Sequence, residues 1–377
     1  MIRREAMNGR ITRVTSIVGA RPQFIKAAAV SRAIVEHNKK SPDHPIVEKI
    51  VHTGQHYDEN MSQIFFEELE IPPPDYNLGV GSGPHGKQTG KMLERIEDVL
   101  LKEKPYCVIV YGDTNSTLAG ALAAAKLHTA IAHVEAGLRS FNRQMPEEIN
   151  RVLTDHIATL LFCPTDTAVK NLEAEGITQG VHQVGDVMYD SILFYTRKAK
   201  AIESKTLKKL NIQSKSYYLA TVHRAENTDD GVRLAHILEA FNEIATEDCP
   251  AILPLHPRTV GYVHKHGLTF GSNVKVTQPV SYLEMVALEN NAKTILTDSG
   301  GVQKEAYFLG VPCITLRNET EWVETVKSGW NTLAGVDRQK IVDAVKKSEN
   351  KPDRQHQTLY ENGRSAEKIC EILLESQ

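Results

Sequence analysis

The sequence lacks an excess of basic residues and a long uninterrupted apolar run. Its 377 residues include 44 Lys or Arg and 47 Asp or Glu, which gives a formal net charge of −3. Broad binding to nucleic acid or to an anionic membrane requires a basic excess, so we expect neither partner, although a local cationic pocket for a small anion is compatible with this charge. The most apolar stretch, residues 117–134, contains Lys126, His128 and His133, which makes it a poor membrane span.

Cysteine is scarce as well and shows no pattern typical of disulfides or metal sites. The chain has 5 cysteines, an odd number, and no CxxC pair. This predicts reduced thiols packed inside a cytoplasmic protein. The basic start of the chain is followed by no continuous apolar core, because Arg13 interrupts it. We therefore expect no signal peptide.

Short apolar runs alternate with helical patterns along the chain, and this predicts an α/β fold with parallel sheets covered by helices. At about 150 residues per domain, the length suggests two or three domains. The simplest architecture is two Rossmann-like, doubly wound domains with a cleft between them. The polar segment 195–215 is expected to form a helix and loop near the junction, and the final helix, after about Leu359, can dock on either domain.

One glycine-rich segment imitates nucleotide-binding motifs without their context. Gly81, Gly83 and Gly86 match G-x-G-x-x-G, but the preceding residues IPPPDYNLG do not predict the strand that a dinucleotide fingerprint requires. Gln88 stands where a P-loop needs Ser or Thr. We therefore predict no NAD site here, but a loop before a helix over 88–102.

The segment GARPQFIK, residues 19–26, follows a predicted strand and so lies at the carboxyl edge of the sheet, where ligands bind in such folds. Pro22 suits the start of a helix over about 22–36. Arg21 and Lys26 can then stand beside a helix N-terminus, which favours an anion. The alternative is two solvated basic residues on the surface.

Acidic residues follow the next two predicted strands. Asp113 comes just after the strand 107–111, and Glu135 ends the strand 130–134. Glu147 and Glu148 open a helix a few residues later. Carboxyl groups gathered at one edge can separate their pKa values into an acid and a base. The alternative is that these are acids at helix N-termini, which we expect for one member of the Glu147/Glu148 pair.

The second half repeats this arrangement with basic residues and glycines. His223 and Arg224 follow one predicted strand, and His256 and Arg258 follow the next, which favours an anionic ligand over structural histidines. Neither histidine belongs to an H-x-x-x-H helix or a Cys/His cluster, so no metal site is predicted. After a further strand, small residues open a helix in a way that suits a diphosphate, and an acid can bind ribose. These residues are Ser299, Gly300, Gly301 and Glu305.

Taken in order, these segments resemble the non-hydrolysing UDP-N-acetylglucosamine 2-epimerases. The resemblance covers nearly the whole chain and implies the two-domain glycosyltransferase-B fold, whose last helix crosses back to the first domain. It therefore implies an N-terminal domain of residues 1–186 plus 358–377 and a UDP-binding domain of residues 187–357. A cytoplasmic homodimer is expected. The segments are GARPQFIK, HTGQH, YGDT, VEAGLR, PEEINR, TVHRAEN, PLHPR and TDSGGVQKEA.

That family inverts carbon 2 of a UDP-sugar by eliminating UDP to a glycal and adding it back. The resemblance implies a UDP-sugar substrate, UDP as the bound intermediate, and no NAD or metal cofactor. It matches Asp113, Glu135 and Glu147 to the catalytic acids and His223 to the catalytic histidine. The residues that it matches to phosphate or UDP binding are Arg21, Lys26, His256, Ser299, Gly300 and Glu305.

Two segments are most similar to the branch acting on UDP-2,3-diacetamido-2,3-dideoxyglucuronate, which serves surface polysaccharides such as O-antigen. Residues 140–145 form a loop two residues shorter than in the common bacterial UDP-GlcNAc enzymes, and Trp322 replaces an arginine of those enzymes. Arg143 can pair with the uronate carboxylate, Asn142 can bond an amide, and Trp322 can pack on an acetamido methyl. The alternatives are epimerisation of UDP-GlcNAc to UDP-ManNAc and, less favoured, a glycosyltransferase or a non-catalytic UDP-sugar binding protein.

Overall fold

The computed structural model describes residues 11–55, 70–255, 257–349, 360 and 363–376. The chain divides into two compact units. Unit 1 comprises Met1–Ser191 and Tyr360–Gln377, and unit 2 comprises Ile192–Leu359. The division falls inside a helix, α7 (Val187–Leu210), which begins in unit 1 and ends in unit 2. The polar segment 195–215 is thus mostly helical.

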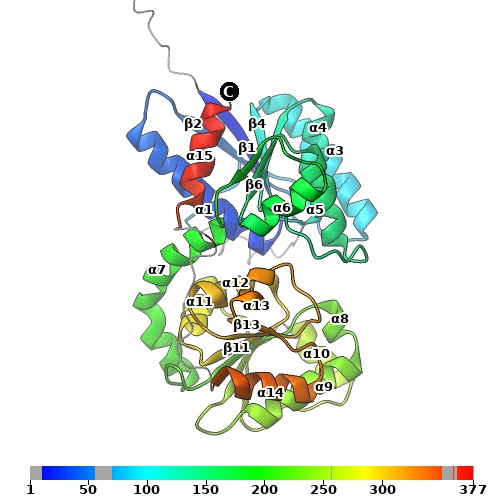
Figure 1. Ribbon diagram of the computed structural model, residues 1–377, viewed down its shortest axis with the longest axis vertical. Helices are drawn as coiled ribbons and strands as arrows, with labels where there is room; N and C mark the ends of the chain where they lie inside the picture. The colour runs from blue at the N-terminus through cyan, green and yellow to red at the C-terminus, as the bar shows by residue number, and fades with distance from the viewer. Residues whose placement is uncertain (1–10, 56–69, 256, 350–359, 361–362, 377) are drawn as a thin grey trace, which may run out of the picture. The chain divides into compact units, whose positions relative to one another are not determined.

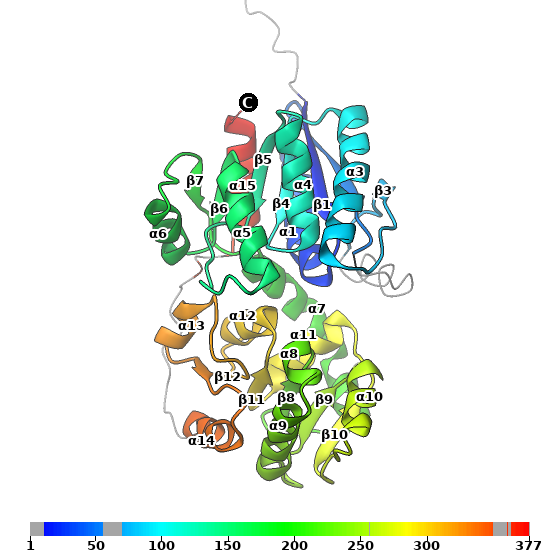
Figure 2. The same ribbon diagram turned by 90° about the vertical axis from the view of Figure 1, so that its right-hand side faces the viewer.

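Unit 1 is built on a parallel sheet of 7 strands in the order β3-β2-β1-β4-β5-β6-β7. Helices α1 and α15 lie together on one face, and α3, α4 and α5 cover the other (Figures 1 and 2). The strands are β1 (Thr12–Val18), β2 (Ile46–His52), β3 (Tyr76–Asn77), β4 (Cys107–Tyr111), β5 (Ala130–Val134), β6 (Leu160–Cys163) and β7 (Val181–Gln183). The helices are α1 (Arg21–Lys40), α3 (His85–Glu103), α4 (Asn115–Lys126), α5 (Pro146–Ile157), α6 (Asp166–Ala174) and α15 (Ser365–Glu375).

Unit 2 has a second parallel sheet, of 6 strands in the order β10-β9-β8-β11-β12-β13. Helices α9 and α14 pack together, as do α11 and α12 (Figure 1). The strands are β8 (Tyr218–Thr221), β9 (Ala251–Pro254), β10 (Val274–Thr277), β11 (Thr294–Thr297), β12 (Cys313–Thr315) and β13 (Asn331–Leu333). The helices are α8 (Ala225–Thr228), α9 (Gly231–Ile244), α10 (Pro257–Lys265), α11 (Tyr282–Asn291), α12 (Gly300–Phe308), α13 (Val323–Lys327) and α14 (Arg338–Glu349).

The predicted α/β class with two doubly wound parallel sheets is confirmed. Strands covered on both faces by helices read as continuous apolar runs, and every residue of β4 is buried. Helix α4 approaches this core closely because Gly120 has no side chain. A Cβ there would lie 3.1 Å from side-chain atoms of Ile17 and Val110. This close packing fixes the N-terminal end of α4, where Asp113 lies.

The C-terminal helix α15 is held within unit 1. Asp190 accepts hydrogen bonds from the backbone N–H groups of Ser365 (3.2 Å) and Ala366 (2.7 Å). These two groups belong to the first turn of α15, which has no intrahelical partners of its own. The helix then packs beside α1.

One strand assignment from the sequence was wrong. The residues before the glycine-rich loop were predicted to contain no strand, but Tyr76 and Asn77 form β3. This strand is too short to produce a sequence pattern, since it only extends the sheet edge by pairing with Val51 and His52. The helix that follows, α3, begins at His85, inside the glycine match.

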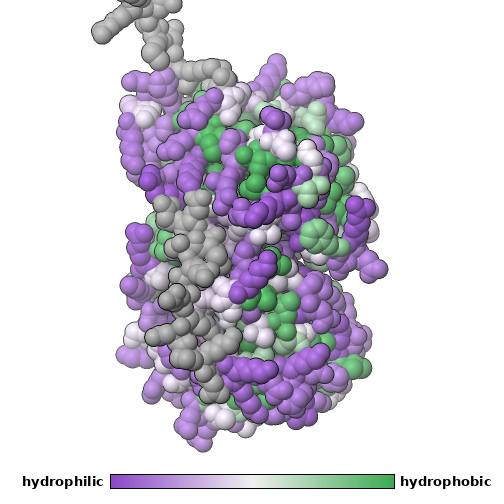
Figure 3. Space-filling model, viewed as in Figure 1, coloured by the Kyte–Doolittle hydropathy of each residue, from purple (hydrophilic) through white to green (hydrophobic). Residues whose placement is uncertain are grey.

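All five cysteines are free thiols, as predicted, and all except the partly exposed Cys249 are buried. Within the described residues, no helix is long and apolar enough to cross a membrane. Hydrophilic side chains cover most of the face drawn in Figure 3.

Candidate active site

In unit 1, the carboxyl ends of β1, β4 and β5 meet at one edge of the sheet. Ile17 of β1 pairs with Val110 of β4, and Tyr111 of β4 pairs with Val134 of β5. The turns that follow these strands therefore lie side by side. They carry three of the predicted site residues: Arg21, Asp113 and Glu135.

Lys26 and Glu135 form an ion pair at this edge. The side chains are only 7% and 6% exposed, so their attraction is little weakened by water. The pair fits because Gly112 lies next to it: a Cβ on Gly112 would stand 2.8 Å from the Lys26 Nζ and 3.3 Å from Glu135 Oε2. Glu135 itself has a φ of 76°, a left-handed conformation that is costly for a residue with a side chain. Such backbone strain is frequent at functional sites.

Asp113 is held by a residue that the sequence analysis did not single out. Its Oδ2 accepts hydrogen bonds from Arg151 Nη2 (2.6 Å) and Nε (3.2 Å). Arg151 is 2% exposed, whereas the Asp113 side chain is 29% exposed. Asn150 also donates to the Asp113 carbonyl, at 2.9 Å. Arg151 and Asn150 of helix α5 thus hold Asp113 in place while part of its side chain stays exposed.

Glu147 and Glu148, neighbours at the start of α5, have different environments. Glu148 is buried, pairs with Arg151, and accepts hydrogen bonds from the backbone N–H groups of Ser140 and Phe141, both at 2.9 Å. Burial raises the pKa of Glu148, but the bonds from Ser140 and the charge of Arg151 outweigh it and lower the pKa overall. Glu147 is half-buried, and its carboxylate has no partner among the described residues. Glu148 is therefore the structural member of the pair.

The N–H groups just before α1 are already bonded by a side chain of the protein. Gln23 accepts hydrogen bonds from the N–H groups of Gly19 (2.9 Å) and Ala20 (3.0 Å). Its amide nitrogen donates to the Tyr111 carbonyl (2.9 Å) and to Thr117 Oγ1 (3.0 Å). These two N–H groups are thus already satisfied, and anion binding here would rest on the half-buried Arg21 side chain.

In unit 2, the carboxyl ends of β8 and β11 place His223 against Asp298. The strands pair at Thr221 and Thr297, and His223 Nδ1 lies 2.8 Å from Asp298 Oδ1. Burial raises the pKa of Asp298, but the hydrogen bonds and charge of His223 and the N–H of Arg224 outweigh it, so the pKa is lowered. The ionised Asp298 therefore orients the ring so that Nε2 points away from it, and the His223 side chain is 60% exposed. This arrangement suits a residue that carries a proton or donates a hydrogen bond to a phosphate.

The Glu321 side chain lies close to the start of α12. Ser299 is the N-cap residue, and a Cβ on Gly300 would lie 2.7 Å from Glu321 Oε1. Gly301 is the second residue of the helix. Glu305, predicted to bind ribose, is 5% exposed and accepts a hydrogen bond from the Tyr282 hydroxyl at 2.8 Å.

The three residues proposed for sugar specificity differ in exposure. Arg143 is exposed and Asn142 half-buried, on a loop anchored by Glu148. Trp322 is 3% exposed, and Lys304 Nζ lies 4.0 Å from its ring centroid, a cation–π contact. One face of the Trp322 ring is thus in contact with Lys304.

Two predicted residues cannot be compared with the structure. His256 lies outside the described residues, and Arg258 belongs to α10 but its side chain is outside them too. In the described part of the chain, no group of three or more His, Cys, Asp or Glu residues is arranged to hold a metal.

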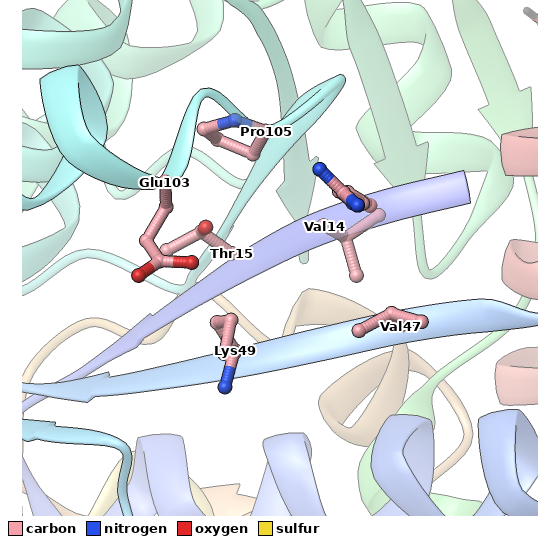
Figure 4. A pocket seen from close by; sticks show the side chains of 7 residues that line it. Val14, Thr15, Val47, Lys49, Glu103 and Pro105 are labelled. Atoms are coloured by element: carbon pink, nitrogen blue, oxygen red, sulfur yellow. The ribbon is translucent and has the colours of Figure 1, made fainter. Parts of the chain in front are cut away.

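A cavity of about 300 Å³ lies away from these residues (Figure 4). Val14 and Thr15 of β1 and Val47 and Lys49 of β2 line it, and Glu103 closes one side. These strand positions lie toward the amino ends of β1 and β2, whereas the acids follow the carboxyl ends of strands. None of the predicted site residues lines this cavity.

Comparison with known proteins gives consistent matches over the whole length. The family model described as UDP-N-acetylglucosamine 2-epimerase matches residues 39–374. A UDP-N-acetylglucosamine 2-epimerase homolog of Methanococcus maripaludis is 57% identical over 96% of this chain and 99% of its own. The UDP-2,3-diacetamido-2,3-dideoxy-D-glucuronate 2-epimerase of Pseudomonas aeruginosa is 53% identical over 96% and 99%. The crystal structure of the Methanocaldococcus jannaschii UDP-GlcNAc 2-epimerase, in complex with UDP-GlcNAc and UDP, has a TM-score of 0.88 at 47% identity, covering 97% of this chain and 100% of that one.

Proposed function

The chain belongs to the UDP-N-acetylglucosamine 2-epimerase family, and from this premise we propose that its substrate is UDP-2,3-diacetamido-2,3-dideoxyglucuronate, which it converts to the manno isomer. The coarser assignment is established by the relatives: the protein is a UDP-sugar 2-epimerase, an isomerase acting on carbohydrates. The glycosyltransferase alternative is not favoured.

The proposed reaction is an elimination followed by its reversal. A base takes the C2 proton, the C–H electrons form the C1–C2 double bond, and the C1–O bond breaks to release UDP. UDP then adds back while a proton arrives on the opposite face of C2. None of these steps transfers a hydride, so the proposed mechanism gives NAD no part, and we propose that it needs no metal either.

The acids of unit 1 support this chemistry. Glu135 follows β5, Asp113 follows β4, and Glu147 lies in the first turn of α5. Glu135 pairs with the buried Lys26 and Asp113 with the buried Arg151, whereas Glu147 has no partner among the described residues. Acid and base roles call for carboxyl groups in different surroundings, which these three have. We assign proton transfer to these three residues.

We assign UDP to unit 2. Ser299, Gly300 and Gly301 bring backbone N–H groups of α12 close to a diphosphate, as helix N-termini do. His223, oriented by Asp298, is placed to donate to a phosphate oxygen or the leaving UDP. Glu305 is assigned to ribose, which requires that it share or release its bond to Tyr282. Arg21, His256 and Arg258 complete the proposed phosphate set.

The observation that carries the substrate proposal is the loop of residues 140–145. Glu148 anchors its first two residues through the N–H groups of Ser140 and Phe141, and the loop lies between Glu135 and Glu147 in the sequence. Its exposed Arg143 supplies a cation for the carboxylate that distinguishes a uronate from UDP-GlcNAc. The 53% identical Pseudomonas aeruginosa relative carries the uronate name. UDP-GlcNAc stays the alternative, supported by a 48% identical UDP-N-acetylglucosamine 2-epimerase of Methanocaldococcus jannaschii.

The test compares kcat/KM for the two UDP-sugars. We expect the wild type to favour the uronate, and Arg143→Ala to lose about 10- to 100-fold of that preference, the value of a charge-assisted bond. The control Arg364→Ala, which removes an exposed arginine from unit 1, should leave the preference unchanged. Turnover of UDP-GlcNAc with none of the uronate contradicts the substrate assignment. A homodimer and a role in surface polysaccharide synthesis stay predictions.

A further inference from the structure

A histidine buried two residues before Glu135 joins β5 to two other parts of the site. His133 of β5 is 0% exposed. Its Nδ1 lies 2.6 Å from Asp155 Oδ1, and its Nε2 lies 2.7 Å from the carbonyl oxygen of Gly112. Because a carbonyl oxygen only accepts hydrogen bonds, Nε2 is the donor in the bond to Gly112. The ring therefore holds Gly112 on one side and Asp155 on the other.

Asp155 has the environment of an ionised group. Burial raises the pKa of Asp155, but His133 and Arg139 outweigh this effect and lower it. Its second oxygen accepts hydrogen bonds from Arg139 Nη1 at 2.6 Å and from the Gly137 N–H at 3.1 Å. The carboxylate of Asp155, from α5, thus connects β5 to the turn that follows it.

We propose that His133 and Asp155 are positioning residues for the acids Asp113 and Glu135. This inference rests on the proposed function of those two acids. Neither His133 nor Asp155 contacts the substrate in this account. They act by fixing the two turns from which the acids project.

The first turn is fixed through Gly112. Its N–H donates to the Val134 carbonyl at 3.0 Å, and its carbonyl accepts from His133. Gly112 is therefore bonded to β5 through both its N–H and its C=O group. Since Asp113 is the next residue, the position of the His133 ring sets how far Asp113 stands from β5.

The second turn is fixed on both sides of Glu135. His133 and Gly137, two residues before and two after it, both bond Asp155. The N–H groups of Glu135 and Ala136 both donate to the Phe162 carbonyl at 3.1 Å. A residue with a φ of 76° persists only where its surroundings over-determine it. The Asp155 clamp provides that restraint.

Asp155 is itself held by a charged neighbour. Arg139, which bonds Asp155, also binds Glu175 through Nε at 2.6 Å and Nη2 at 2.8 Å. Arg139 therefore lies between the carboxylates of Asp155 and Glu175. Two further titratable groups face this network: the exposed His156 on α5, 3.8 Å from Glu175, and Cys163 on β6, whose pKa burial raises to about 12 so that it stays neutral.

Nitrogen-15 NMR of histidine-labelled protein tests the bond to Gly112 directly. We expect Nε2 of His133, assigned with the His133→Gln variant, to carry the proton that it donates to the Gly112 carbonyl. A bare Nε2 at pH 7 overturns the positioning of Gly112 by the ring. Since this signature does not depend on turnover, it separates failure of this inference from failure of the proposed function, which full activity of Glu135→Gln would reveal.

Kinetics of Asp155→Asn and His133→Gln test the positioning role. Asp155→Asn removes the carboxylate and His133→Gln removes the ring, and both keep a side chain that can form hydrogen bonds. Misplacement of a catalytic group costs on the order of 100-fold in rate, so we expect a loss of that order in kcat, with KM and UDP affinity within about twofold of the wild type. The control His156→Gln, on the same helix, should keep wild-type kcat. Folded variants with wild-type kcat, or a loss confined to KM, overturn the proposal.

Discussion

Lys26 and Glu135, 109 positions apart in the sequence, form an ion pair in which neither side chain is more than 7% exposed. Each side chain thus brings an opposite charge into direct contact with the other's buried charge. Removal of one partner from such a pair leaves the other uncompensated and costs more than the pair itself contributes. The stability of unit 1 therefore depends on Glu135, one of the residues proposed to transfer a proton.

Lys26→Met should destabilise the protein strongly. Loss of one partner of a buried pair costs roughly 3–5 kcal/mol in free energy of unfolding, measured by urea denaturation. The control Lys39→Met breaks the exposed pair with Glu36 and should cost less than about 1 kcal/mol. Adding Glu135→Gln to Lys26→Met should restore part of the loss. Equal effects of the two lysine substitutions would show that the Lys26 pair is not buried in solution.

The neighbours Glu147 and Glu148 should respond differently to the same substitution. Glu147→Gln removes a carboxylate assigned to proton transfer, a function worth about 100- to 10,000-fold in rate, and should leave the free energy of unfolding unchanged. Glu148→Gln removes a buried charge paired with Arg151 and should lower stability by about 3 kcal/mol. Parallel turnover and denaturation measurements check this. Equal losses of turnover and stability in both variants would contradict the division of roles.

The other two acids extend this comparison. Asp113→Asn and Glu135→Gln keep the shape of each side chain, and we expect turnover of the folded protein to fall by at least about 100-fold in at least one of them. Glu135→Gln also leaves the buried Lys26 charge without its carboxylate and should lower the free energy of unfolding. Circular dichroism controls for folding. Near-normal turnover in Asp113→Asn, Glu135→Gln and Glu147→Gln together would show that the acids only cap and stabilise the fold.

Gly300→Ala should weaken UDP binding. The added Cβ would stand 2.7 Å from Glu321 Oε1, which a shift of the Glu321 side chain can relieve. The expected effect therefore comes from the methyl group itself, which would keep the diphosphate away from the N–H groups assigned to it. We expect UDP affinity to fall at least about tenfold, or about 1.4 kcal/mol, by calorimetry. Gly261→Ala, in the same unit with nothing within 4 Å of the added Cβ, is the control. Unchanged affinity in Gly300→Ala would show that UDP does not bind at this helix.

Stability should depend on pH through His52. Burial lowers its pKa to about 4, from an ordinary value of 6.5. Between these values the unfolded chain binds the proton and the folded chain does not, so the contribution is fully present above pH 6.5 and is lost as the pH falls towards 4. The shift corresponds to at most about 3 kcal/mol. Denaturation of the wild type and His52→Asn at several pH values measures it, and an unchanged pH slope in the variant would contradict the assignment.

The sequence predicted the elements of the fold well where a strand or helix is long and patterned. The apolar run Cys107–Tyr111 is β4, the helix expected over 22–36 is α1, and that expected over 88–102 is α3. Short strands such as β3 escaped prediction, because a two-residue edge strand has no periodicity to detect.

The candidate site was predictable in its strand-end positions but not in its partners. Motifs indicated Asp113 and Glu135, because they end or follow apolar strands. They did not reveal Arg151, Asp155 or the pairing with Lys26, because these contacts join residues 22 to 109 positions apart. Likewise, the sequence alone shows Trp322 as an apolar replacement, and only the fold shows that Lys304 covers its ring.

Proton exchange at carbon 2 tests the central claim most directly. The purified protein is incubated with the UDP-diacetamidouronate in deuterated water, without added NAD or metal, and the products are analysed by NMR and mass spectrometry. Elimination and re-addition predict the manno isomer with one solvent deuterium at carbon 2. Epimerisation without deuterium at carbon 2, or activity that disappears when bound NAD is removed, would contradict the account.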